Sequence, residues 1–300
     1  MISRLTGNQL GALLMVGSMA GFTLNDGMVK LAGQSLPLSQ ILVVRGVAVS
    51  LLIYSLARSY GGLRLSLSRR DWALVAGRSL AEIATTYFFL SALLTLPIAN
   101  VTAILQMLPL TVTLAAALLF GEQVGWRRAT AIGVGFFGML LIVRPGADGF
   151  DTGTGYALAA VICITARDLF TRRMSAAVPS LTVTLMAALS VLVFGLGLGL
   201  QETWQPLPLL TKLILLLAAG CIFIGYLFSV MVMRVGDVAA VSPFRYTGLL
   251  WALLLGWLMF DNWPDTLTLI GAAIVVAAGI FSLLRERPRR AATPDLSPPE

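Results

Sequence analysis

Residues 98–143 read IANVTAILQMLPLTVTLAAALLFGEQVGWRRATAIGVGFFGMLLIV, two long apolar runs on either side of a short polar segment. A helix that crosses a bilayer needs about 20 predominantly apolar residues. The runs 98–120 and 126–143 meet this requirement or come close to it. The stretch therefore predicts two membrane-spanning helices joined by a short loop, and the rest of the chain follows the same pattern.

The composition of the whole chain indicates the same class. Of its 300 residues, 58% are hydrophobic and 12% are charged, about half the usual charged share. These values exclude a disordered protein, a nucleic-acid-binding domain and an ordinary soluble enzyme. The chain has no histidine, and its two cysteines, Cys163 and Cys221, lie in apolar runs. We therefore expect an all-α membrane protein with no catalytic residues, no metal site and no cofactor.

Basic residues set the expected orientation, because loops on the cytoplasmic side carry an excess of Lys and Arg. With ten spans, fourteen basic residues fall on one side of the membrane and three on the other, and both chain termini are cytoplasmic. The net charge of +7 follows from this bias. The ten expected spans are 10–29, 38–57, 72–94, 98–120, 126–143, 153–171, 181–200, 209–231, 238–260 and 264–284.

The two halves of the chain repeat each other. Asp26 lies 11 residues before Pro37, as Asp168 does before Pro179, and the offset between these pairs is 142 residues. A unit with five spans enters the membrane inverted in its second copy, which is a pattern typical of transporters. We expect a first repeat over residues 1–146, an inverted second repeat over 147–286, and a disordered cytoplasmic tail over 287–300.

Several runs resemble the EamA-type transporters of the drug/metabolite transporter superfamily. The resemblance implies ten helices in two inverted repeats, a bacterial inner-membrane location and secondary transport of small organic metabolites. After the ninth span the family often has Gly-Glu, whereas this chain has Asp261-Asn262. The runs that carry the resemblance are Gly121-Glu122-Gln123-Val124-Gly125-Trp126-Arg127-Arg128, Leu140-Leu141-Ile142-Val143-Arg144-Pro145-Gly146, Arg167-Asp168, Pro243-Phe244-Arg245-Tyr246 and Leu269-Ile270-Gly271-Ala272-Ala273.

Ionisable residues within the spans are candidates for the transport site. Each costs at least about 2.5–3.5 kcal/mol at membrane depth and therefore needs a partner or a use. Four positive charges face three negative ones, so one positive charge is left for a carboxylate of the substrate. These residues are Arg45, Arg78, Arg167 and Arg245 against Asp26, Glu82 and Asp168.

Most of these charges have a structural alternative. Arg78 and Glu82 are four residues apart, so they form either an internal salt bridge or a polar pocket wall. Asp26 either pairs with Lys30 at the membrane surface or binds a substrate amine or a coupling proton. Asp168 favours an ion pair with its basic neighbours, Arg167 and Arg172.

Two further groups complete the candidate site. Arg245, followed by Tyr246 and Trp251, is suited to bind a carboxylate and to cover an apolar part of a substrate, unless it pairs with Glu82 or Asp168. Arg45 has no acidic neighbour in its own span and must reach across to another. Gln106 lies one turn before Pro109, which is expected to kink its helix and free a carbonyl.

The sequence predicts a secondary carrier that moves an amino acid or amino-acid derivative by alternating access. Its expected partners are the small-molecule substrate, the lipid bilayer and, as a candidate coupling ion, the proton; nucleic acid is not expected. The alternatives are a drug-like organic-cation exporter, a lipid flippase and a non-transporting membrane subunit. A monomer and a homodimer are both compatible with the sequence. The predicted substrate-binding residues are Asp26, Arg78, Glu82, Gln106, Arg245, Tyr246 and Trp251.

Overall fold

A computed structural model describes residues 7–59, 66–121, 125–144, 151–175, 178–235 and 241–284. The regular structure of these residues is helical, without a strand. The predicted tail over 287–300 and the predicted boundary between the halves at 146–147 lie outside them. The helices are α1 (Gly7–Ala32), α2 (Leu38–Ser59), α3 (Arg69–Thr95), α4 (Ile98–Leu105), α5 (Leu108–Phe120), α6 (Trp126–Val143), α7 (Thr152–Arg173), α8 (Ser180–Gly199), α9 (Leu209–Val235), η2 (Ser242–Tyr246), α11 (Thr247–Phe260) and α12 (Thr266–Leu284).

The helices lie where the apolar runs of the sequence predict spans, but they differ in membrane character. Six segments are long and apolar enough to cross a bilayer, whereas the apolar parts of α6 and α12 are shorter and α3 carries several charges. Two of these charges, Arg78 and Glu82, face the interior of the bundle, as described below. The six segments are Gly7–Ala32, Leu38–Arg58, Ile98–Phe120, Thr152–Arg173, Ser180–Gly199 and Leu209–Ser229.

Two spans are interrupted. The predicted kink at Pro109 is confirmed, because α4 ends at Leu105 and α5 begins at Leu108 with the proline in its first turn. The span over 238–260, predicted as one continuous helix, contains the 3-10 helix η2 before α11. Pro243 lies in the first turn of η2, and its missing N–H removes a backbone hydrogen bond. The sequence analysis did not anticipate this second break.

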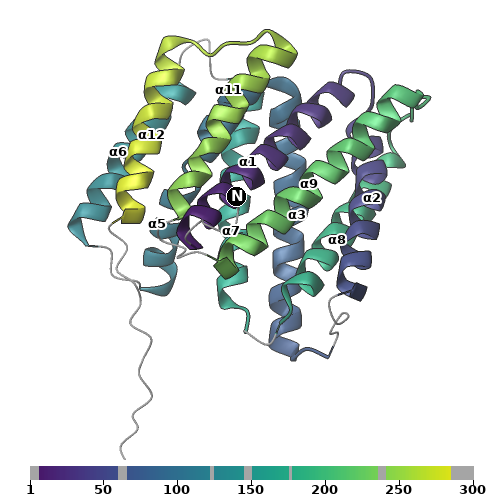
Figure 1. Cartoon of the computed structure of the whole chain (residues 1–300), viewed down its shortest axis with the longest axis horizontal. Coiled ribbons are helices and arrows are strands. Elements are labelled where there is room, and N and C mark those ends of the chain that lie inside the picture. Colours follow the sequence, from purple (N-terminus) through teal and green to yellow (C-terminus); the bar gives the residue numbers. More distant parts are fainter. Residues whose placement is uncertain are drawn as a thin grey trace, which may run out of the picture.

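The helices of the two halves pack mainly on each other (Figure 1). α1 packs along α9 and α3 packs along α7, while α2 pairs with α8 at one edge of the bundle and α6 with α12 at the opposite edge. In chain order, α1, α2, α3 and α6 of the first half match α7, α8, α9 and α12 of the second half. Under this match the α1–α9 pair corresponds to the α3–α7 pair, whereas the α2–α8 pair and the α6–α12 pair each correspond to themselves. The packing therefore has the pattern of a two-fold exchange between the halves.

Matched helix ends have matched backbone conformations. α5 ends at Gly121 with φ +66°, and α11 ends at Asp261 with φ +50°, both in the left-handed region. Glycine adopts this conformation freely, and aspartate is among the few other residues that tolerate it. Asp261 therefore gives α11 the same left-handed helix end that Gly121 gives α5.

Candidate functional site

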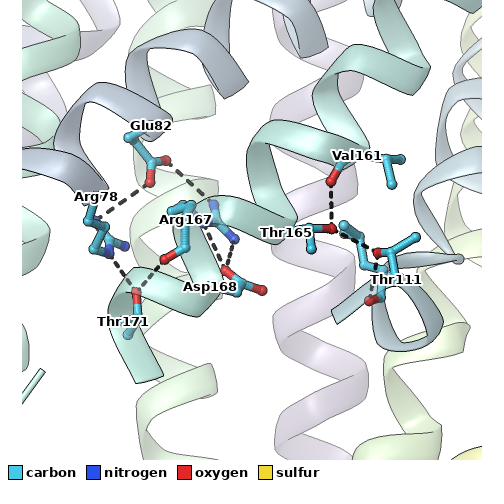
Figure 2. A network of polar contacts seen from close by, with 9 residues as sticks. Arg78, Glu82, Thr111, Val161, Thr165, Arg167, Asp168 and Thr171 are labelled. Carbon is cyan, nitrogen blue, oxygen red and sulfur yellow. Dashed lines mark hydrogen bonds and ion pairs between the residues drawn. The ribbon is translucent and has the colours of Figure 1, made fainter. Parts of the chain in front are cut away.

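An ionic network joins α3 to α7 in the interior of the bundle (Figure 2). Glu82 on α3 lies between two guanidinium groups, with Arg78 Nη1 3.6 Å from Oε2 and Arg167 Nη1 3.6 Å from Oε1. Arg167 also contacts its neighbour Asp168, with Nη2 2.9 Å from Oδ1. Arg78 Nε donates a hydrogen bond to Thr171 Oγ1 at 3.1 Å. The predicted Arg78–Glu82 and Arg167–Asp168 pairs are confirmed, and Glu82 links them across two helices.

One donor atom and one acceptor atom of the network make no hydrogen bond in the part of the chain that the structure describes. Within the described residues, neither Arg78 Nη1 nor Glu82 Oε2 makes a hydrogen bond, although both atoms are buried. The side chains of Arg78 and Glu82 are only 15% and 14% exposed. An unsatisfied buried polar atom costs about 1–3 kcal/mol. The two atoms instead face each other as an ion pair at 3.6 Å, and among the described residues neither has a hydrogen-bonded partner.

A second polar group lies between α1 and α2. Asn25 Nδ2 donates to Asp26 Oδ1 at 2.9 Å, and Arg45 Nη1 donates to Asn25 Oδ1 at 3.2 Å. The prediction that Arg45 reaches across to another helix is confirmed. Lys30, the alternative partner of Asp26, donates instead to the carbonyl oxygens of Leu93 and Leu96 at 2.6 and 2.7 Å. Lys30 therefore caps the end of α3, and the expected surface pair with Asp26 is wrong.

Tyr226 on α9 connects the two groups. Arg45 interacts electrostatically with Asp26, Tyr226 and Glu82. The Tyr226 phenol lies within electrostatic range of Glu82, Arg167, Arg78 and Arg45. Five helices, α1, α2, α3, α7 and α9, thus contribute to one charged cluster, which consists of Asp26, Arg45, Arg78, Glu82, Arg167, Asp168 and Tyr226.

Aromatic side chains gather next to this cluster, about one turn further along α3. Tyr87 makes edge-to-face contacts with Tyr156 on α7 and Phe194 on α8, with ring centres 6.3 and 6.2 Å apart. Phe88 lies 6.1 Å from the Tyr156 ring at a tilt. These rings form an apolar surface beside the ionic network. Tyr87 and Tyr226 are not among the substrate-binding residues predicted from the sequence, because isolated aromatic residues in apolar helices carry no distinguishing pattern.

The structure does not bring the other predicted residues into the charged cluster. Arg245 on η2 is exposed, and none of the cluster contacts within the described residues involves it. Tyr246 is buried and points its hydroxyl at Gly279 of α12. Gln106 lies at the break between α4 and α5, beside Gly248, and Trp251 is half-buried on α11. The structure thus divides the predicted residues between two regions.

Because Arg245 lies outside the cluster, the cluster holds one positive charge fewer than the count over all spans. Three arginines, Arg45, Arg78 and Arg167, face three carboxylates in the cluster. The expected surplus of one positive charge depended on Arg245 and is wrong for the cluster. A substrate that enters it therefore meets balanced charges.

A comparison with protein families matches both halves of the chain. The model of the EamA-like transporter family matches residues 9–144 and again residues 151–284. The two matches together include nearly all of the described residues.

Curated relatives along most of the chain carry transporter names. An S-adenosylmethionine uptake transporter of Rickettsia prowazekii is 23% identical over 90% of this chain and 91% of its own length. A pseudopaline exporter of Pseudomonas aeruginosa is 28% identical over 90% and 94%. A riboflavin transporter of Vibrio cholerae is 26% identical over 90% and 92%.

A solved crystal structure of a protein has the same fold. It superposes with a TM-score of 0.63 at 18% identity, over 91% of this chain and 96% of its own length. At this identity the likeness shows the fold alone.

Proposed function

The chain belongs to the EamA-like transporter family, and on that premise we propose that this multi-pass small-molecule transporter is a secondary carrier that works by alternating access. It has ten membrane spans, in two inverted repeats, with both termini on the cytoplasmic side of a bacterial inner membrane. Two observations support this topology: the exchange pattern of the helix pairs and the strong bias of basic residues to one side.

The proposed substrate carries a carboxylate and an amine, as an amino acid or an amino-acid derivative does. The observation that supports this substrate is the buried ion pair of Arg78 Nη1 and Glu82 Oε2, which lie 3.6 Å apart without a hydrogen bond. A guanidinium binds a carboxylate through charge-assisted hydrogen bonds, and a carboxylate accepts such bonds from an ammonium group. A zwitterion that inserts at this pair satisfies both atoms.

The balanced cluster charge fits the same substrate class. A zwitterion adds one positive and one negative charge, so the cluster stays neutral when the substrate binds. A single-charged ion would leave an unpaired charge at membrane depth, at a cost of at least about 2.5–3.5 kcal/mol. This argument weighs equally against a simple anion and an organic cation.

A planar aromatic solute is a second candidate, favoured by the rings of Tyr87, Phe88, Tyr156 and Phe194 beside the cluster. Aromatic faces and edges stabilise stacked rings by about 0.5–1.5 kcal/mol each beyond their buried area. One relative is named as a riboflavin transporter. A solute with both a ring system and an amino-acid group would use the aromatic surface and the ionic pair together.

Proton coupling through Asp26 or Glu82 is part of the proposal. Both carboxylates lie in the charged cluster, where the binding of a proton changes the charge that a substrate meets. The Glu82→Gln variant is expected still to bind substrate, but more weakly because the charge-assisted bond to the amine is lost, and to lose the pH dependence of transport. Unchanged pH dependence would leave Asp26 as the candidate.

The test is solute counterflow in proteoliposomes that hold the purified protein. Vesicles are preloaded with unlabelled amino acids, S-adenosylmethionine, riboflavin or an organic cation, and uptake of the labelled solute is followed. We expect accumulation with the amino acids, and its loss in Arg78→Gln. The matched control is Arg144→Gln, which removes a more exposed ion pair with Asp265 outside the cluster and is expected to keep transport.

Two results would count against the substrate assignment. Accumulation in Arg78→Gln at the wild-type rate would remove the ionic pair from the site. Exchange of riboflavin alone would favour the aromatic solute over the zwitterion.

A further inference from the structure

A groove on the side of the bundle lies apart from the charged cluster. It measures about 410 Å³ and runs between α3, α5 and α7. Leu74, Leu119, Phe120 and Phe170 contribute to its apolar wall, and Arg173 is the charged residue of the lining. The volume falls within the range of about 300–1,000 Å³ that is typical of ligand-binding pockets.

The groove uses the outward side of α7. Ala166, Phe170 and Arg173 line it and are spaced i, i+4 and i+7, so they share one face of the helix. Arg167 and Thr171, which belong to the ionic network, occupy another face and point to α3. The groove and the proposed transport site therefore use different sides of the same helix.

Arg173 is held at the rim of the groove by an aromatic ring. Its guanidinium carbon lies 4.1 Å from the centre of the Phe120 ring, at cation–π distance. The Arg173 side chain is exposed, and it has no ion pair with a carboxylate in the part of the chain that the structure describes. A positioned cation thus stands next to an apolar wall.

The lining residues come from helix ends on one side of the membrane. Arg173 ends α7, Phe120 ends α5, and Leu74 lies near the beginning of α3. In the proposed topology all three ends are cytoplasmic. Basic pockets between spans on this side bind the head groups of acidic lipids.

We propose that this lateral groove binds one anionic phospholipid of the cytoplasmic leaflet, with an acyl chain along the apolar wall and the phosphate on Arg173. The charge of Arg173 complements the phosphate, and the apolar wall matches a hydrocarbon chain. The choice of leaflet depends on the proposed topology. The site is independent of the transported solute, because none of the groove residues belongs to the charged cluster.

The test is native mass spectrometry of the purified full chain with bound lipid. Phosphatidylglycerol and phosphatidylcholine with the same acyl chains are supplied in equal amounts. We expect the wild type to retain phosphatidylglycerol about fivefold more than phosphatidylcholine, which corresponds to about 1 kcal/mol for one arginine. In Arg173→Gln this ratio is expected to fall to about one.

Two further variants separate the head-group contact from general positive charge and from the acyl chain. Arg127→Gln is the matched control, because Arg127 also lies over an aromatic ring, that of Trp126 at 5.3 Å, but does not line the groove. It is expected to keep the preference. Leu119→Trp places a bulky ring on an exposed wall position and is expected to lower the retention of both lipids.

The proposal is overturned if Arg173→Gln keeps the wild-type ratio, or if Arg127→Gln loses as much of it as Arg173→Gln does. Unchanged retention in Leu119→Trp would overturn the placement of the acyl chain. Circular dichroism checks that each variant is folded. Lipid retention is measured without transport, so a failed counterflow assay does not affect this test.

Discussion

The α3–α7 and α1–α9 pairs occupy matched places in the two halves, but different chemistry holds them together. Between α3 and α7 the contacts are ionic and polar: Glu82 pairs with Arg167, and Arg78 bonds to Thr171. Between α1 and α9 the backbones approach closely at Gly21, where an added Cβ would lie 2.8 Å from the Cys221 carbonyl oxygen. Charged side chains stabilise the α3–α7 pair, whereas close packing of the backbones stabilises the α1–α9 pair.

This difference shows which features the two halves share and which they do not. The shared features are the helix pairing and the helix ends, as at Gly121 and Asp261. The distribution of charge is not shared, because only the α3–α7 pair carries a carboxylate between two guanidinium groups. The substrate site of our proposal therefore lies off the pseudo-symmetry axis, against α3 and α7.

The largest expected effect on stability comes from removing the central carboxylate of the α3–α7 pair. Glu82→Gln leaves Arg78 and Arg167 without their shared partner, and breaking a buried ion pair costs about 3–5 kcal/mol. Chemical unfolding in detergent measures the free energy of unfolding. The control is Arg144→Gln, whose ion pair with Asp265 is more exposed and is expected to contribute less than about 1 kcal/mol. Equal losses in the two variants would refute the ionic description of this pair.

The next effect tests close packing between α1 and α9. In Gly21→Ala the new methyl group would meet backbone atoms, the Cys221 carbonyl oxygen at 2.8 Å and the Gly225 nitrogen at 3.1 Å. Overpacking of this kind costs about 1–3 kcal/mol. The control is Gly220→Ala on α9, where nothing lies within 4 Å and helix propensity favours alanine. If Gly21→Ala were as stable as the control, close approach would not hold this pair together.

A smaller effect is expected from a hydrogen bond between α1 and α9. The buried Ser18 hydroxyl donates to the Gly225 carbonyl at 2.7 Å. Ser18→Ala is expected to lower the free energy of unfolding by about 1 kcal/mol. Ser190→Ala is the matched control, because that hydroxyl bonds to the Met186 carbonyl of its own helix. A loss in Ser18→Ala that does not exceed the control would show that the bond contributes little.

The smallest effect is pH-dependent and lies at the end of the α3–α7 pair where α3 begins and α7 ends. Hydrogen bonds from the Ser68 hydroxyl and the Ser175 N–H hold the pKa of Asp71 below its usual value. A lowered pKa in the folded state means that the carboxylate stabilises the protein above the ordinary pKa of about 4 and loses this effect as the pH falls through the folded value.

The melting temperatures of the wild type and Asp71→Asn should therefore differ most near pH 7 and converge below about pH 4. The Ser175 hydroxyl also donates to Asp71 Oδ2 at 3.2 Å, so the same comparison in a Ser175→Ala background should show a smaller difference at pH 7. A difference that stays constant across this range would remove Asp71 as a titrating contact between α3 and α7.

Local sequence spacing predicted much of the fold. Apolar runs located the helices, and Pro109 predicted the break after α4, because both signals depend only on neighbouring residues. The Arg78–Glu82 pair followed from its spacing of four on one helix. The break at η2 was missed, although Pro243 lies in it, because a proline near the start of a span is also compatible with an unbroken helix.

The contacts between helices could not be predicted from the sequence. Glu82 meets Arg167 only because α3 packs along α7, and Lys30 turns from Asp26 to the end of α3 for the same kind of reason. No local pattern distinguishes Arg245 from the other arginines in the spans, but in the structure it lies on η2, outside the cluster. These contacts depend on which faces of two helices pack together, and no local pattern in a single sequence indicates which faces do so.

The central claim is that Arg78 and Glu82 recognise the two charges of one substrate. The most direct test is counterflow of the exchanged solute against unlabelled analogues that lack only its amine or only its carboxylate. The account predicts that each analogue exchanges at least about tenfold more slowly than the intact solute, since each loses a charge-assisted hydrogen bond of about 1.5–3 kcal/mol. Exchange of either analogue at the rate of the intact solute would contradict it.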